Sequence, residues 1–96
     1  MYQYSIKSIN EAERWIFVSG DDEWDTEEPD SFVFLMKKIR DRVDGHIVKV
    51  DETGYGIPED GLGLRYQWDT LFGITIVYPE TTPLEKVISF LLSVFY

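Results

Sequence analysis

The chain has 96 residues, no cysteine and a single histidine, which excludes disulfides, zinc thiolates, a cysteine nucleophile and a multi-histidine metal site. Its length is that of one domain, so we expect a single domain over residues 1–96 with one hydrophobic core. Eighteen acidic against nine basic residues give a formal charge of −9. We therefore expect no direct binding to nucleic acid and no binding to an anionic membrane, since both require a cationic surface.

The N-terminal segment is predicted to form a strand and then a short helix. Residues 2–7 alternate apolar with polar side chains, which is typical of a half-buried strand. Ser8 with Glu11, or Asn10 with Glu13, then has the spacing of a capping box at the start of a helix.

The sequence opens without the basic and apolar pattern of a secretory signal, and no apolar run reaches the roughly 18 residues of a membrane span. We therefore expect a cytoplasmic protein.

Residues 21–30 hold seven acidic side chains and no basic one. Like charges this close repel one another, so a solvated loop is the ordinary expectation. The alternating acids resemble a calcium-binding loop, but Thr26 and Phe32 occupy the positions where that loop needs glycine and glutamate. Trp24 lies within the run, where it suits equally a fold-back of the chain and contact with a partner.

A second helix is predicted from Pro29 and Asp30 to about Val43. Acidic residues crowd its N-terminus and basic residues its C-terminal half, which suits the helix dipole, and Gly45 is placed to end it. Its apolar side chains recur with helical spacing and form one stripe: Phe32, Leu35, Met36, Ile39 and Val43.

A strand is predicted over residues 46–51, followed by a long surface loop over 52–63, where glycines and a proline cluster. Residues 64–69 and 73–78 have the pattern of two strands joined by a tight connection, which indicates a hairpin. Tyr66 and Trp68 share one face of the first strand, and we expect that face to be buried in the core.

The C-terminal segment is predicted to form a helix. Thr82 caps it, Pro83 suits the first helical position and Glu85 completes a capping box. Phe90 and Val94 widen its apolar surface, so the helix is buried on more than one side or meets a partner. Its apolar residues with helical spacing are Leu84, Val87, Ile88, Leu91, Leu92 and Phe95, of which Leu84, Ile88, Leu91 and Leu92 define the expected inner stripe.

These elements predict a single α+β domain in the order β-α-α-β-β-β-α. Two consecutive short helices do not suit alternating β-α units, so we expect a mostly antiparallel four-stranded sheet with the helices packed on one face. No internal repeat and no linker divides the chain.

The sequence offers no complete catalytic or cofactor-binding motif. Two Gly-x-Gly pairs within residues 54–63 complete no phosphate-binding pattern. His46 with Asp44 or Asp51 is the one histidine-based arrangement, and a half-exposed surface histidine is the simpler interpretation. A pair of carboxylates can serve as acid and base in hydrolysis, but eighteen acidic residues offer so many pairs that none of them indicates an active site. A small enzyme that uses Asp and Glu therefore stays open as an alternative. Our primary expectation is no catalytic residue, no cofactor, no metal and no enzymatic activity.

The stretch from Leu64 to Ile74 (LRYQWDTLFGI) has the look of a family signature. A short, strongly acidic, cysteine-free α+β chain with acids and aromatics on exposed loops resembles the small immunity proteins of bacterial toxin–immunity systems. These include the immunity proteins of contact-dependent growth inhibition and related polymorphic toxins. The resemblance implies that the chain binds a cognate toxin domain, often a basic nuclease, and blocks its active site or substrate groove. It implies no cofactor and no catalytic residue.

Two loops are the predicted partner-binding surfaces. A nuclease presents a basic cleft to its phosphate substrate, and an acidic loop that enters the cleft gains fast association and specificity from charge complementarity. Aromatic side chains among the acids would supply the desolvated centre of such an interface. The first surface, named here the acidic block, comprises Asp21, Asp22, Glu23, Trp24, Asp25, Glu27 and Glu28. The second, on the glycine-rich loop, comprises Glu52, Tyr55, Glu59 and Asp60.

Two further alternatives stay open. An inhibitor that mimics DNA, such as a phage anti-restriction protein, would also be small and acidic. It would spread its charges in rows with phosphate spacing, whereas here they are concentrated in one block. A homodimer formed through Phe90, Val94 and Tyr96 of the C-terminal helix is the other alternative.

Overall fold

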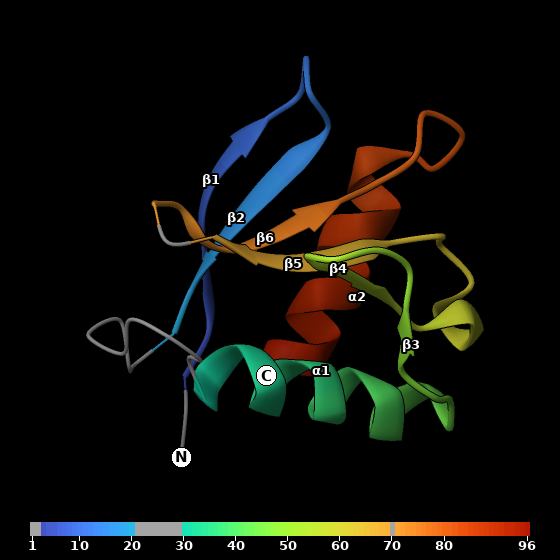
Figure 1. The fold of residues 1–96 in the computed structure, drawn as a ribbon. Helices are drawn as coiled ribbons and strands as arrows, with labels where there is room; N and C mark the ends of the chain where they lie inside the picture. The colour runs from blue at the N-terminus through green and yellow to red at the C-terminus, as the bar shows by residue number, and fades with distance from the viewer. Residues whose placement is uncertain (1–2, 21–29, 70) are drawn as a thin grey trace.

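A six-stranded antiparallel sheet carries two helices in the computed structural model, which describes residues 3–20, 30–69 and 71–96 (Figure 1). The strands are β1 (Ser5–Asn10), β2 (Trp15–Ser19), β3 (Val48–Lys49), β4 (Gly54–Gly56), β5 (Arg65–Asp69) and β6 (Gly73–Val77). The helices are α1 (Asp30–Val43) and α2 (Leu84–Phe95), and a short 3-10 helix, η1 (Pro58–Asp60), precedes β5. In the view of Figure 1, α2 lies behind the sheet and α1 runs below it.

The strand order β1-β2-β6-β5-β4-β3 brings the strands before α1 and the strands after it into one sheet. Each neighbouring pair of strands is antiparallel, as predicted. Strands β3 to β6 follow one another as a meander, and β6 then pairs with β2 of the N-terminal hairpin. The β2–β6 pairing therefore joins segments that lie far apart in the sequence.

The two faces of the sheet differ in what covers them. Ile16 lies opposite Ile76, and Val18 lies opposite Ile74. All four side chains are buried and belong to one hydrophobic cluster with the buried side chains of α1 and α2. Successive residues of a strand point to opposite faces, so the residues between them point away from the helices, toward what we call the outer face.

The predicted N-terminal helix is wrong. Residues 11–14 form a turn, and Trp15–Ser19 is strand β2. The bond expected of the capping box does form, since the Asn10 side chain accepts from the backbone N–H of Glu13 at 3.1 Å, but it closes a turn. The strand predicted over residues 2–7 is β1, Ser5–Asn10. Ladders with β1 and β6 on both sides of β2 outweigh a short helical signal.

The surface loop predicted over residues 52–63 contains β4 and η1. A Cβ added at Gly54 would come within 2.5 Å of the guanidinium carbon of Arg65 on the neighbouring strand. The glycine thus admits the Arg65 side chain across the sheet instead of marking a loop.

With β2 and β4 added, the described residues form six strands and two helices in the order ββαββββα, where we had predicted four strands and three helices. The strand predicted over residues 46–51 is the short β3.

The predicted second helix and the predicted hairpin are confirmed. α1 buries four of the five predicted stripe residues, and Val43 is half-buried against the same cluster. The end of α1 has a Schellman geometry: Asp44 adopts a φ of 53°, and the Gly45 N–H donates to the Arg40 carbonyl at 2.9 Å. β5 and β6 form the predicted hairpin, and Tyr66 and Trp68 face the core as expected.

α2 is confirmed as a helix, and its predicted inner stripe is confirmed in part: Leu91 is buried, and Leu84 and Ile88 are half-buried against the core. The buried residues are Val87, Leu91, Val94 and Phe95, whereas Leu92 is 41% exposed. The predicted cap is also wrong, because the N-cap position is Pro83 and the Thr82 hydroxyl donates instead to the Leu62 carbonyl at 2.8 Å. Val94 packs in the core of its own chain, so it offers nothing to a dimer interface.

Two adjacent leucines of α2 test this packing. We expect Leu91→Ala to lower the free energy of unfolding by about 2–5 kcal/mol, because Leu91 is fully buried. The matched control, Leu92→Ala, should lose less than about 1 kcal/mol, since that side chain is partly solvated already. Urea denaturation of both variants measures the difference, and equal losses would contradict the observed orientation of α2.

Candidate binding surface

Of the two predicted binding surfaces, only the second lies among the described residues. The acidic block, with Trp24 inside it, lies outside the described residues. Of the second surface, Glu52 is exposed in the turn before β4, and Tyr55 is half-buried in β4 with its ring 6.0 Å from that of Phe32. Glu59 and Asp60 are neighbours in η1, where Glu59 is exposed and Asp60 is buried. Their carboxylates are held by contacts within the chain.

Asp60 forms a buried pair with Tyr66. The Tyr66 hydroxyl donates to Asp60 Oδ2 at 2.8 Å, and Asp60 Oδ1 accepts from the backbone N–H groups of Leu62 and Gly63 at 2.7 and 3.0 Å. Burial, with a smaller effect of the Asp60 charge, raises the pKa of Tyr66, so the hydroxyl stays protonated and donates. Both carboxylate oxygens of Asp60 are therefore engaged in fixing the turn that leads into β5.

Glu59 ties η1 to the segment that follows α1. Its Oε2 lies 2.7 Å from His46 Nδ1, and its Oε1 accepts from the His46 backbone N–H at 3.0 Å. The hydrogen bond from that N–H is the main cause that lowers the pKa of Glu59. Gly45 permits the contact, because a Cβ there would lie 2.5 Å from Glu59 Oε1. The histidine considered with Asp44 or Asp51 thus has Glu59 as its partner, in an exposed pair.

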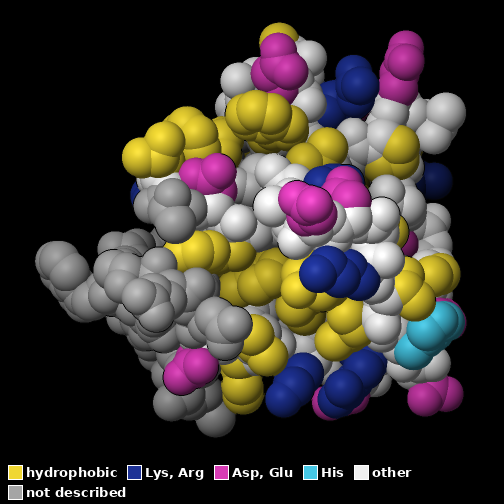
Figure 2. All heavy atoms as spheres, in the orientation of Figure 1, with side chains coloured by type: hydrophobic (Ala, Val, Ile, Leu, Met, Phe, Trp, Pro, Cys, Tyr) yellow, Lys and Arg dark blue, Asp and Glu magenta, His cyan; other side chains and the backbone are white. Residues whose placement is uncertain are grey.

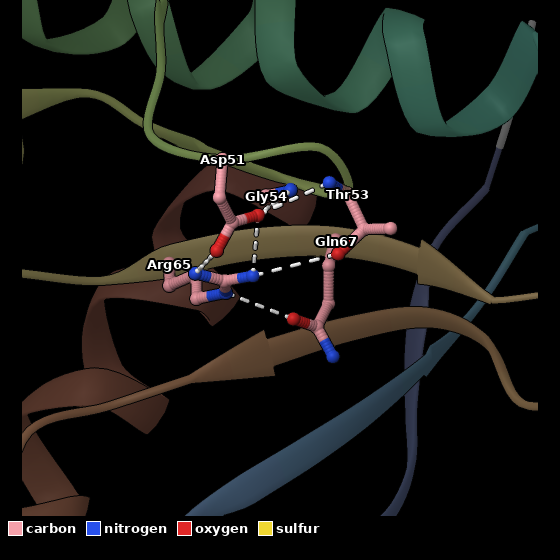
Figure 3. A network of polar contacts seen from close by, with 5 residues as sticks. All are labelled: Asp51, Thr53, Gly54, Arg65 and Gln67. Carbon is pink, nitrogen blue, oxygen red and sulfur yellow. Dashed lines mark hydrogen bonds and ion pairs between the residues drawn. The ribbon is translucent and has the colours of Figure 1, made fainter.

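A polar network on the outer face fixes the β3–β4 turn to β5 (Figure 3). Arg65 is bidentate to Asp51: Nη2 donates to Oδ1 at 2.8 Å, and Nη1 pairs with Oδ2. The Nε of Arg65 donates to Gln67 Oε1 at 2.9 Å. Asp51 Oδ1 also accepts from the backbone N–H groups of Thr53 and Gly54. The Arg65 hydrogen bond and the Thr53 N–H together lower the pKa of Asp51 to about 2.

Aromatic side chains gather on the same outer face. The rings of Trp15 and Phe17 meet edge to face with centroids 6.1 Å apart, and Phe17 meets Phe72 at 5.6 Å. We call Trp15, Phe17 and Phe72 the aromatic row. Phe72 is 51% exposed and its neighbour Leu71 is 85% exposed. This row was not predicted from the sequence, although the alternation within Trp15–Ser19 was a signal for it.

The described residues gather no group of side chains that could hold a metal ion. Across residues 3–20, 30–69 and 71–96, no three His, Asp or Glu side chains cluster as a metal site requires. Neither α1 nor α2, the helices of the described part, is long and apolar enough to cross a membrane. What this part of the chain presents is a surface: acidic side chains, the polar network and the aromatic row.

Comparison with known proteins adds no relative. No family model matches the chain, and neither a curated protein nor a solved structure matches it.

The Asp51–Arg65 pair predicts an acid-dependent part of stability. A folded-state pKa lowered from 3.8 to about 2 means that the pair stabilises the fold fully above about pH 4 and that this contribution is lost as the pH falls toward 2. We expect the melting temperature of wild type to exceed that of Asp51→Asn at pH 6, and the gap to close toward pH 2. Thermal melts followed by circular dichroism measure it. A gap that is constant over this range would contradict the assignment.

Proposed function

We propose that this chain is a non-catalytic binding protein that neutralises a cognate basic toxin domain, of nuclease type, by covering its active site or substrate groove. It would act as the immunity protein of a bacterial toxin–immunity pair. The observation that carries the proposal is the twofold excess of acidic over basic residues, with a formal charge of −9.

Much of this charge is not balanced within the fold. In the described part of the chain, arginine side chains pair with Asp41 and Asp51, Glu59 is hydrogen-bonded to His46, and Asp60 is buried against Tyr66. Exposed carboxylates of the same part that join none of these pairs are Glu11, Glu13, Asp44, Glu52, Asp69, Glu80 and Glu85. Uncompensated charge of one sign destabilises a compact state through self-repulsion. A cationic partner would relieve that repulsion, which supports a basic surface as the target.

Charge complementarity suits neutralisation of a nuclease. The cleft of a nuclease is lined with Lys and Arg side chains that bind the phosphates of its substrate. An acidic protein competes with the nucleic acid for the same cationic side chains. Steered association between opposite charges can reach about 10⁸–10⁹ M⁻¹s⁻¹ at low salt. A toxin inhibitor benefits from that speed because it must bind before the toxin acts.

The test starts with capture of partners from the source cell and identification by mass spectrometry. The captured partner is then purified and assayed for nuclease activity against rising amounts of this chain. We expect a basic domain whose activity is abolished at equimolar ratio. A partner with no toxic activity, or one whose activity survives an excess of this chain, would refute the toxin proposal.

The acidic block gives the proposal a second, quantitative prediction. Replacing Asp22, Glu23, Asp25 and Glu27 with their amides keeps side-chain volume and removes four charges. If the block lies at the rim of the interface, association with the purified partner slows at low salt and matches wild type at high salt. If it enters the cleft, dissociation accelerates at every salt concentration. Surface plasmon resonance separates these results, and unchanged rates would exclude the block from the interface.

A further inference from the structure

The outer face of the sheet is not covered by the helices. Both helices pack with the buried side chains on the opposite face in one hydrophobic cluster, to which Trp15, Phe17 and Val77 do not belong. The ladder aligns Trp15 with Val77 and Phe17 with Thr75 across β2 and β6, and Thr75 with Gln67 across β6 and β5. Alternation along the strands therefore sets an apolar strip and the polar network on the same face of the sheet, on either side of Thr75, which is itself buried.

The connection between β5 and β6 presents two apolar side chains at the edge of this surface. Asp69 Oδ1 accepts from the backbone N–H groups of Leu71 and Phe72 at 2.6 and 3.2 Å, and Gly73 adopts a φ of 72°. Phe72 packs on Phe17, whereas Leu71 is left 85% exposed. An apolar side chain stabilises a fold only to the extent that it is removed from water. The exposed Leu71 side chain therefore contributes little to the stability of its own chain. Leu71 lies next to Phe72, which is 51% exposed and packs on the half-buried Phe17, and apolar side chains grouped at a surface are typical of interaction sites.

We propose that the outer face, centred on Phe17, Leu71 and Phe72, is a docking surface for a basic protein segment, and the proposed function enters this inference only in the basic character of the partner. An apolar side chain of the partner packs on Leu71 and Phe72. Cationic side chains beside it pair with the carboxylate of Asp69, whose hydrogen bonds use Oδ1 and leave Oδ2 for a cation.

Charge complementarity selects this occupant over a second copy of the chain. Figure 2 shows acidic side chains beside the apolar ones near the β1–β2 turn and the β5–β6 connection, while basic side chains gather lower, over α1, with others near the β1–β2 turn and the centre of the view. The guanidinium of Arg65 on the outer face is already paired with Asp51. Two copies that met through this face would bring exposed carboxylates such as Asp69 close together, and like charges across an interface are disfavoured. A basic segment meets the same carboxylates with attraction.

The experiment uses a displayed library of random 12-residue peptides selected on the full chain. We expect the selected peptides to combine Arg or Lys with an aromatic or aliphatic residue. Leu71→Ser should weaken a selected peptide at least about tenfold, on the scale of an interface hot spot. Tyr96→Ser is the matched control: Tyr96 is 88% exposed at the end of α2, and its replacement should leave the affinity unchanged. Asp69→Asn keeps the turn's acceptor oxygen, so it should weaken binding at low salt and not at high salt.

Every other result counts against the proposal. Peptides without basic residues, peptides that bind Leu71→Ser as well as wild type, or no enrichment at all would overturn it. Loss of binding in the acidic-block amide variant but not in Leu71→Ser would move the site to that block. A dimer in analytical ultracentrifugation that Leu71→Ser dissociates would give the face to a second copy. The peptide test needs no toxin, so the docking surface and the toxin proposal can fail independently.

Discussion

The ladder between β2 and β6 joins the N-terminal hairpin to the strands that follow α1. It places Ile16 opposite Ile76, both fully buried, in the centre of the cluster that both helices cover. Without this ladder the β1–β2 hairpin would have no apolar surface to cover, and an isolated hairpin is marginally stable at best. Bringing segments this far apart in the sequence together costs conformational entropy. That cost is offset only when the whole hydrophobic cluster forms. The N-terminal hairpin and the C-terminal meander therefore depend on each other.

The same ladder determines what the outer face carries. Once Ile16 and Val18 point to the core, Trp15 and Phe17 must point away from it, because side chains alternate along a strand. A register shift of one residue would bury the aromatic side chains and expose the isoleucine and valine. The aromatic row is thus a fixed consequence of how the core is built. Its position next to Phe72 follows from the β5–β6 hairpin that pairs with β2.

The sequence predicted the elements whose signals are local. α1 has a full helical stripe, the β5–β6 hairpin has two alternating runs, and α2 has a long apolar pattern. β2 was missed because its five residues compete with the Asn10–Glu13 helix signal, and only the distant β6 resolves the competition. β4 was missed because Gly54 and Gly56 disfavour strands by themselves, and the contact that accounts for Gly54 is with the side chain of Arg65 on β5. The outer face joins β2 to β5 and β6, so the alternation within β2 could indicate its aromatic side chains but not the residues that lie beside them.

The outer face and the excess acidic charge would act at different ranges in binding. Charges in solvent are felt over about 8–10 Å at physiological salt, so acids anywhere on the surface can attract a basic partner before contact. Apolar side chains such as Leu71 and Phe72 contribute only when water leaves the interface, and so they lower the dissociation rate. The long-range attraction would be shared among many carboxylates, and losing one would change it little. The contact would rest on a few side chains held by one hydrogen-bonded turn. On these physical grounds, the specificity of binding would be concentrated at the β5–β6 connection.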